Sequence, residues 1–146
     1  MRKEKMMVLV LTTLLVTPLM GRAETLAEKE KKAPQNKSLA ENLQSTNESC
    51  GTAITASIDW ASITPADLDQ YGPAGYCDEA MAAIRGLCGT DDGKAAVKGK
   101  IKKLVCTVGG AGKRAVALKD GTLRYTIDWK ASNNTDFVND YLKNNI

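Results

Sequence analysis

The sequence contains no histidine, and aromatic residues make up only 5% of its 146 positions. Without histidine the chain cannot assemble a Ser-His-Asp or Cys-His catalytic centre, and it lacks the commonest protein ligand of catalytic zinc. The few aromatic residues also argue against the stacking platforms that bind single-stranded nucleic acid. The available chemistry is therefore that of carboxylates, lysines, tyrosines and serines.

Motifs for metals and cofactors are also missing. The chain has no Cys-x-x-Cys pair, so neither a thioredoxin-like redox motif nor a structural zinc site is expected. Its acidic residues lack the spacing of a calcium-binding loop. The glycine-rich stretch 109–113 is not a phosphate-binding loop, because Thr107 stands where the first glycine is required and Arg114 where Ser or Thr is required. We therefore expect no metal site and no cofactor.

The N-terminus has the three-part layout of a secretory signal peptide. Three basic residues precede an apolar run at 6–20, and residues 21–23 form a small-x-small cleavage pattern. The run is shorter than the roughly 18 to 20 apolar residues that span a bilayer, so a retained transmembrane anchor is the weaker interpretation. We expect cleavage after Ala23 and a soluble, secreted or periplasmic protein with no membrane span.

Removal of residues 1–23 changes the charge balance of the chain. The full sequence has 20 basic and 17 acidic residues, and the signal removes four basic residues and one acidic residue, which leaves 16 of each. A formal charge near zero does not suit a protein that coats nucleic acid, so nucleic acid is not an expected partner.

Residues 24–49 differ in composition from the rest of the chain. Glu, Lys, Asn, Gln and Ser dominate this segment, it has no aromatic residue, and its leucines are widely spaced. Such a segment buries too little apolar surface to offset the entropy of ordering it. We therefore predict a flexible polar leader at 24–49, with a short helix at 39–43 as the alternative, and a single folded domain at 50–146.

The four cysteines all lie within 50–146, and an even number in an exported domain of this size predicts two disulfides. Apolar spacing predicts a helix from Cys77 to Cys88, whose ends would be roughly 16 Å apart, beyond the approximately 7 Å that a disulfide spans. A second helix at 93–102 would return along the first and bring Cys106 towards Cys77. We favour Cys50 with Cys88 and Cys77 with Cys106, while the pairing of Cys50 with Cys77 and of Cys88 with Cys106 stays open.

Strands are indicated by alternating apolar and polar residues. The predicted strands are 54–60, 104–108, 115–119 and 122–129, and a helix follows from about Thr135. Asp120 and Gly121 provide a hairpin signal between the last two strands. These elements predict an α+β fold: a small disulfide-stabilised domain with an antiparallel sheet of three or four strands and helices packed on one face.

Basic residues concentrate in the second predicted helix and around the glycine-rich turn. The candidate binding patch comprises Lys94, Lys98, Lys102, Lys103, Lys113 and Arg114. Such a patch suits an anionic polymer or an acidic protein, although lysines at i, i+4 spacing are also typical of a solvated helix face. We interpret the chain as an exported, soluble, non-enzymatic binding or accessory module whose partner is a protein or an anionic envelope polymer.

The alternative function is a small carboxylate-based hydrolase that acts on an envelope or extracellular glycan. Such an enzyme needs two carboxyl groups about 5 to 10 Å apart across a groove. Glu79 with Asp59 is a candidate pair, whereas the adjacent acids at 78–79 and 91–92 are explained by helix termini. The sequence assigns no catalytic residue.

Overall fold

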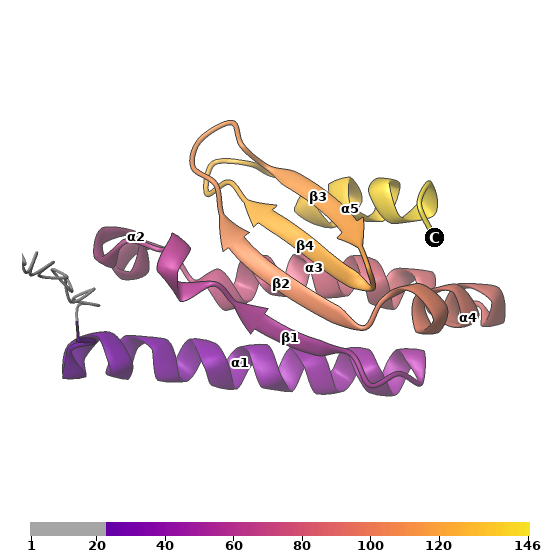
Figure 1. The fold of residues 1–146 in the computed structure, drawn as a ribbon, viewed down its shortest axis with the longest axis horizontal. Helices are drawn as coiled ribbons and strands as arrows, with labels where there is room; N and C mark the ends of the chain where they lie inside the picture. The colour runs from indigo at the N-terminus through magenta and orange to yellow at the C-terminus, as the bar shows by residue number, and fades with distance from the viewer. Residues whose placement is uncertain (1–22) are drawn as a thin grey trace, which may run out of the picture.

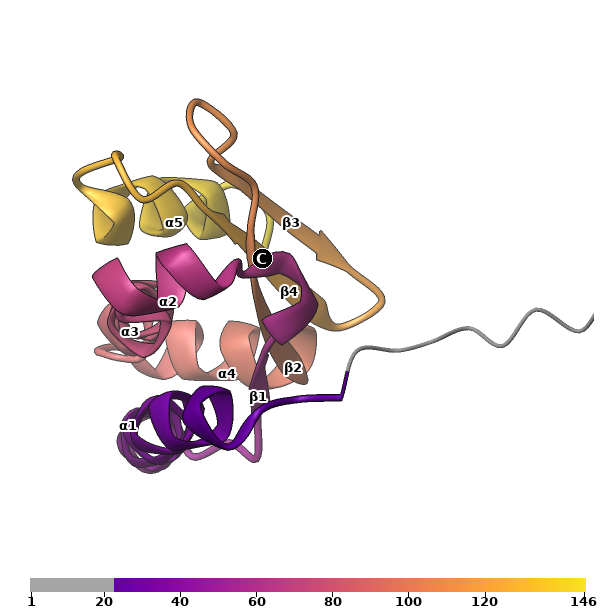
Figure 2. The same cartoon turned by 90° about the vertical axis from the view of Figure 1, so that its left-hand side faces the viewer.

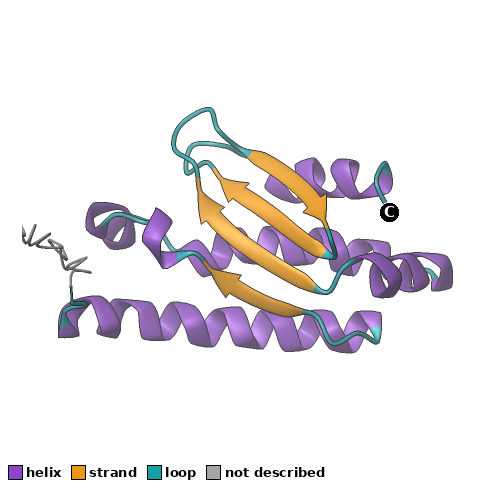
Figure 3. Cartoon of the chain, viewed as in Figure 1, coloured by secondary structure: helices purple, strands orange, loops and turns teal. Residues whose placement is uncertain are grey.

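The computed structural model describes residues 23–146, so the predicted signal peptide lies outside the described residues except for Ala23. This part of the chain forms helices and a four-stranded sheet (Figures 1 and 3). In chain order the elements are α1 (Leu26–Cys50), β1 (Thr55–Ile58), the 3-10 helix η1 (Trp60–Ser62), α2 (Pro65–Gln70), α3 (Pro73–Leu87), α4 (Asp91–Lys100), β2 (Lys103–Val108), β3 (Ala115–Lys119), β4 (Thr122–Ile127) and α5 (Asn134–Lys143). Among residues 23–146, no helix combines the length and the apolar character needed to cross a membrane.

The sheet has the order β1-β2-β4-β3 and is mixed. β1 and β2 are parallel, β2 and β4 are parallel, and only β3 and β4 are antiparallel. The α+β class is confirmed, but the expectation of a purely antiparallel sheet was wrong. β3 runs opposite to β2 but is not its neighbour, because β4 lies between them. β4 follows β3 through a hairpin and so reverses direction again, which makes β4 parallel to β2.

The helices cover one face of the sheet, as expected, and leave the other face open (Figure 2). The side chains between the two layers form one core, in which the largest fully buried apolar residues are Met81, Ile84, Val97, Ile101, Leu104, Leu123, Tyr125, Ile127, Val138 and Leu142. Alternate residues of β4 enter this core, because successive side chains of a strand point to opposite faces.

The segment 24–49 is not a flexible leader. It forms the long helix α1, which packs against α3 and β1. Thr25 caps the first turn through reciprocal hydrogen bonds with Glu28, and Gly51 ends the helix in the left-handed conformation that favours glycine. The domain therefore begins well before Cys50.

Few side chains of α1 are fully buried, and two of the contacts that hold the helix in place are polar. Leu39 and Thr46 are buried. The Arg85 guanidinium donates a hydrogen bond of 2.9 Å to the Thr46 hydroxyl, and the backbone N–H of Ala74 donates one of 3.1 Å to the Gln35 side chain. These polar anchors explain why an apolar-periodicity argument did not find the helix.

Two disulfides cross-link the domain, and they are the pairs that the predicted helical hairpin favoured. Cys50–Cys88 ties the end of α1 to the end of α3, and Cys77–Cys106 ties α3 to the middle of β2. All four cysteines are buried, and none is free. Covalent links of this kind suit a small domain with a limited core.

Candidate anion-binding surface

The hairpin between β3 and β4 rests against the junction of α4 and β2. The carbonyl oxygen of Gly121 accepts hydrogen bonds from the backbone N–H groups of Lys102 and Lys103, at 2.8 and 3.1 Å. Asp120 and Gly121 both have positive φ, at 50° and 76°, which matches the turn type preferred in two-residue hairpins. A β-carbon on Gly121 would lie 3.1 Å from the Lys102 Cγ, so glycine also permits this close approach.

Strand register then places three cations on the open face. Lys103 of β2 pairs with Thr122 of β4, which pairs with Lys119 of β3. Arg124 lies two residues along β4 and shares the same face. With strands about 4.8 Å apart and residues about 3.4 Å apart along a strand, the α-carbons of Lys103 and Lys119 are separated by about 10 Å and Arg124 lies one row away.

We call this region the basic surface. It comprises Lys98, Lys100, Lys102, Lys103, Lys119 and Arg124, all of which are exposed. None of the six forms an ion pair with another residue of the range 23–146. The positive charge is therefore available to an external anion.

The strand register places the hydroxyl side chains of Thr107, Thr122 and Thr126 on the same open face as these cations. A shallow cavity of about 430 Å³ is lined by Ala117, Lys119, Asp120, Thr122 and Arg124. Asp120, in the hairpin turn, is the acid of that lining. Thr122 in this lining offers a hydroxyl donor beside the cations.

The structure divides the patch that the sequence predicted. Lys94 and Lys98 lie on α4, and Lys102 and Lys103 lie just before and at the start of β2, whereas Lys113 and Arg114 follow the far end of β2. All of these residues except the half-buried Arg114 are exposed. The predicted patch is therefore two groups separated by the length of a strand.

Arg114 has a structural role in that second group. Its guanidinium donates hydrogen bonds to the Ser132 carbonyl at 2.6 Å and to the Asn134 side chain at 3.1 Å, and it stacks 4.1 Å from the centre of the Phe137 ring. Because these contacts use the donors of Arg114 internally, the basic surface is centred on the start of β2 instead.

Lys119 and Arg124 were not among the predicted patch residues. Arg124 occupies a polar position in the alternating pattern of its strand, which indicated that it would face solvent. No signal in the sequence placed it beside Lys103, because that neighbourhood depends on β4 entering between β2 and β3.

The candidate carboxylate pair does not face across a groove. Glu79 of α3 lies on the helical side and accepts a hydrogen bond of 2.6 Å from Asn134. Asp59 follows β1 and accepts a hydrogen bond of 3.4 Å from Thr107, whose side chain lies on the open side of the sheet. The sheet separates the two acids, so they do not form the cross-cleft arrangement of a glycosidase.

A polar cluster closes the end of the core beyond β4. The backbone N–H groups of Lys130 and Gly112 donate to the Asp128 carboxylate at 3.0 and 2.7 Å, and these bonds lower the pKa of Asp128. Burial raises the pKa of the Tyr125 phenol, with a smaller contribution from Glu79. The Tyr125 hydroxyl is buried and has no hydrogen-bond partner among the described residues.

No cluster of three or more metal-ligating side chains occurs within residues 23–146. A comparison of the chain with protein-family models, with curated proteins and with solved structures finds no match.

Proposed function

We propose that the protein is an exported, non-enzymatic binding module that contacts an anionic polymer through the basic surface. The observation that carries the proposal is the set of six exposed cations, none of them in an ion pair, on α4, β2, β3, β4 and the connection between α4 and β2. The signal-like N-terminus and the two disulfides support an oxidising compartment outside the cytosol.

A polymer fits this surface better than a small anion. Each exposed ion pair contributes only about 0.2 to 1 kcal/mol, so one charged group would be held weakly. Cations whose α-carbons lie about 8 to 10 Å apart on one face of the sheet can engage successive charges of one chain, and the contributions of linked contacts then combine. Hydroxyl groups on the same face add hydrogen bonds to sulfate, phosphate or carboxylate oxygens.

The proposal is tested with dextran sulfate as the probe and uncharged dextran as its control. The mature chain should bind dextran sulfate in isothermal titration calorimetry and should not bind dextran. Replacement of Lys103, Lys119 and Arg124 by alanine should weaken binding about tenfold, since three modest ion pairs are lost.

A matched variant tests the location of the binding surface. Replacement of Lys29, Lys37 and Lys143 by alanine removes the same charge from exposed positions outside the basic surface. Equal loss of affinity in the two variants would show only a response to net charge and would overturn the proposed site. Binding of an acidic protein in place of the polymer would reassign the partner and contradict the polymer proposal.

A further inference from the structure

One carboxylate lies among the cations of the basic surface. The cavity of about 430 Å³ on the open face is lined by Ala117, Lys119, Asp120, Thr122 and Arg124. Strand register pairs Lys119 with Thr122 and Ala117 with Arg124. These four side chains therefore form a block two strands wide on one face of the sheet, and Asp120 closes the block at the hairpin turn.

The Asp120 carboxylate has no partner within the part of the chain that the structure describes. It is exposed and accepts no hydrogen bond from another residue of the range 23–146. It also forms no ion pair there, although Lys119 and Arg124 line the same cavity. The basic surface thus carries an open hydrogen-bond acceptor beside its cations.

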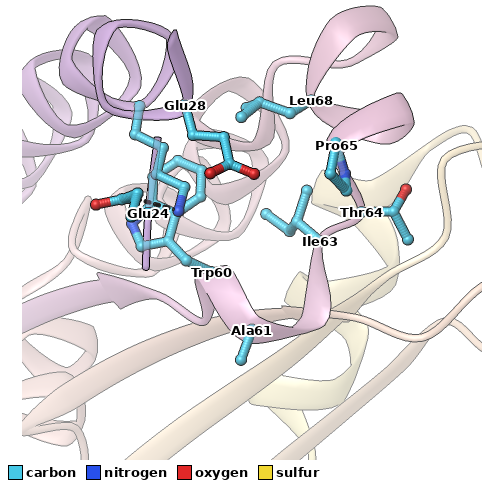
Figure 4. A pocket seen from close by; sticks show the side chains of 9 residues that line it. Glu24, Glu28, Trp60, Ala61, Ile63, Thr64, Pro65 and Leu68 are labelled. Carbon is cyan, nitrogen blue, oxygen red and sulfur yellow. Dashed lines mark hydrogen bonds and ion pairs between the residues drawn. The ribbon is translucent and has the colours of Figure 1, made fainter. Parts of the chain in front are cut away.

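The carboxylates of another cavity show the contrast. Glu24 and Glu28 line a cavity of about 420 Å³ between the start of α1, η1 and α2 (Figure 4). Glu24 pairs with Lys32. The Glu28 carboxylate accepts hydrogen bonds from the backbone N–H and the hydroxyl of Thr25, at 2.8 and 3.0 Å. Both acids of that cavity are engaged by the protein itself, whereas Asp120 is not.

The hairpin turn does not require a charged residue at position 120. The φ of 50° at Asp120 lies in the left-handed region, and asparagine suits this type of turn as well as aspartate does. Asp120 is the only acid in the lining of its cavity, and its charge opposes the attraction of a polyanion to the cations. Turn chemistry therefore explains the conformation of this residue but not its charge.

A carboxylate beside cations distinguishes two kinds of anionic polymer. An ionised carboxylate only accepts hydrogen bonds, so it can bond only to a ligand that donates them. The chain of a polyphosphate carries charges without hydroxyl donors and is repelled by the carboxylate. An acidic polysaccharide carries free ring hydroxyls beside its carboxylate or sulfate groups. Its hydroxyls can donate to Asp120, and hydrogen bonds to a charged acceptor are about twice as strong as neutral ones.

We propose that Asp120 makes the basic surface selective for acidic polysaccharides. Lys119 and Arg124 bind the carboxylate or sulfate groups of the polymer, and the Asp120 carboxylate accepts hydrogen bonds from ring hydroxyls of the same chain. Ala117 offers a small apolar contact for the C–H groups of a sugar ring. This selectivity rests on the proposed polymer-binding function and defines the ligand class of the same surface.

Three polymers test the selectivity in isothermal titration calorimetry: polygalacturonate, its fully O-acetylated derivative and polyphosphate. Acetylation keeps the carboxylates of polygalacturonate and removes its hydroxyl donors. The mature chain should bind polygalacturonate about fivefold more tightly than the acetylated polymer, which corresponds to one net hydrogen bond. Equal affinity for these two polymers would overturn the proposed role of Asp120.

Asp120→Asn isolates the charge, because asparagine keeps the turn. The preference for free hydroxyls should fall from about fivefold to about twofold, since the amide oxygen accepts only a neutral hydrogen bond. Polyphosphate should bind this variant about threefold more tightly, because a repulsive charge is removed. Asp140→Asn removes the same charge from an exposed position of α5. This control should keep the hydroxyl preference and change polyphosphate affinity by less than about twofold.

Two further results would contradict the assignment. One is a hydroxyl preference that Asp120→Asn retains in full, because the loss on acetylation would then reflect only the bulk of the acetyl groups. The other is an equal gain of polyphosphate affinity in Asp120→Asn and Asp140→Asn, which would show a response to net charge alone. Dextran sulfate separates the two proposals. If the mature chain does not bind it, both fail; if the chain binds it and acetylation of polygalacturonate has no effect, only the role of Asp120 fails.

Discussion

Removal of the Cys50–Cys88 disulfide should lower the free energy of unfolding by an amount that depends on the length of the loop it closes. The two residues are 38 positions apart, and the loop-entropy relation gives about 4 kcal/mol at 25 °C for a closed loop of this size. For a domain of this length such a loss corresponds to a decrease of about 15 °C in the midpoint of thermal unfolding. Alanine is the suitable replacement for both cysteines, because they are buried and serine would add unpaired hydroxyl groups.

The assay is denaturant unfolding followed by tryptophan fluorescence, with hydrogen exchange to locate the effect. α1 retains Leu39 and the Arg85–Thr46 hydrogen bond after the disulfide is removed, so it should stay docked in the native state. Its amides should nevertheless exchange faster than those of α3, because the link at its end is lost. A loss below about 1 kcal/mol, or equal acceleration in α1 and α3, would refute the view that this bond fastens α1 to the domain.

Three further predictions concern single side chains. Asn47→Ala should lower the free energy of unfolding, measured with denaturant, by about 2 kcal/mol. The Asn47 side chain accepts a 2.8 Å hydrogen bond from the Ile54 N–H and donates a 2.9 Å hydrogen bond to the Ile54 carbonyl, and the variant loses both. An unchanged denaturant midpoint would contradict this. The pKa of Asp128 is lowered in the folded state, so the contribution of this carboxylate to the free energy of unfolding is present above the unfolded pKa of about 3.9 and is lost as pH falls through the folded value. Asp128→Asn should therefore flatten the decline of stability in acid. An identical pH profile for the variant would count against this prediction. The pKa of Tyr125 is raised in the folded state, so stability is lost as pH rises above about 10, where the phenol ionises in the unfolded chain. Tyr125→Phe should reduce that loss. The variant should change the free energy of unfolding little at neutral pH, because the hydroxyl has no hydrogen-bond partner in the described chain.

The disulfide framework and most elements of the second half of the chain were predictable from local patterns. A helix cannot join Cys77 to Cys88 across its own length, and this geometric fact removed one of the three possible pairings. Alternating residues located β3 and β4 because one side of each strand is buried and the other is exposed.

The helix α1 was missed because its stability comes from contacts that composition does not record. Its apolar residues are sparse, and Pro34 lies within the helix, where proline removes a backbone hydrogen bond. A disulfide, the buried Thr46 and a cap at Thr25 compensate. Of these, only the Thr25-x-x-Glu28 pattern could have been read from the sequence as the start of a helix.

The candidate surface was predicted in part. The lysines of α4 were evident from their spacing, but the contribution of Lys119 and Arg124 depends on strand order. Strand order is set by which non-local pairing buries the core best, and alternation within each strand does not reveal it. The separation of Lys103 from Lys113 follows from β2, the strand predicted at 104–108, which lies between them.

The salt dependence of polyanion binding tests the proposed function most directly. The dissociation constant for dextran sulfate should be measured between low and physiological salt for the mature chain and for the variant lacking the Lys103, Lys119 and Arg124 side chains. Each cation that displaces a counterion adds about 0.7 to the logarithmic slope for a single-chain polyanion, so the slope should fall in magnitude by about 2 in the variant. An unchanged slope would show that these three side chains do not contact the polymer and would contradict the proposed surface.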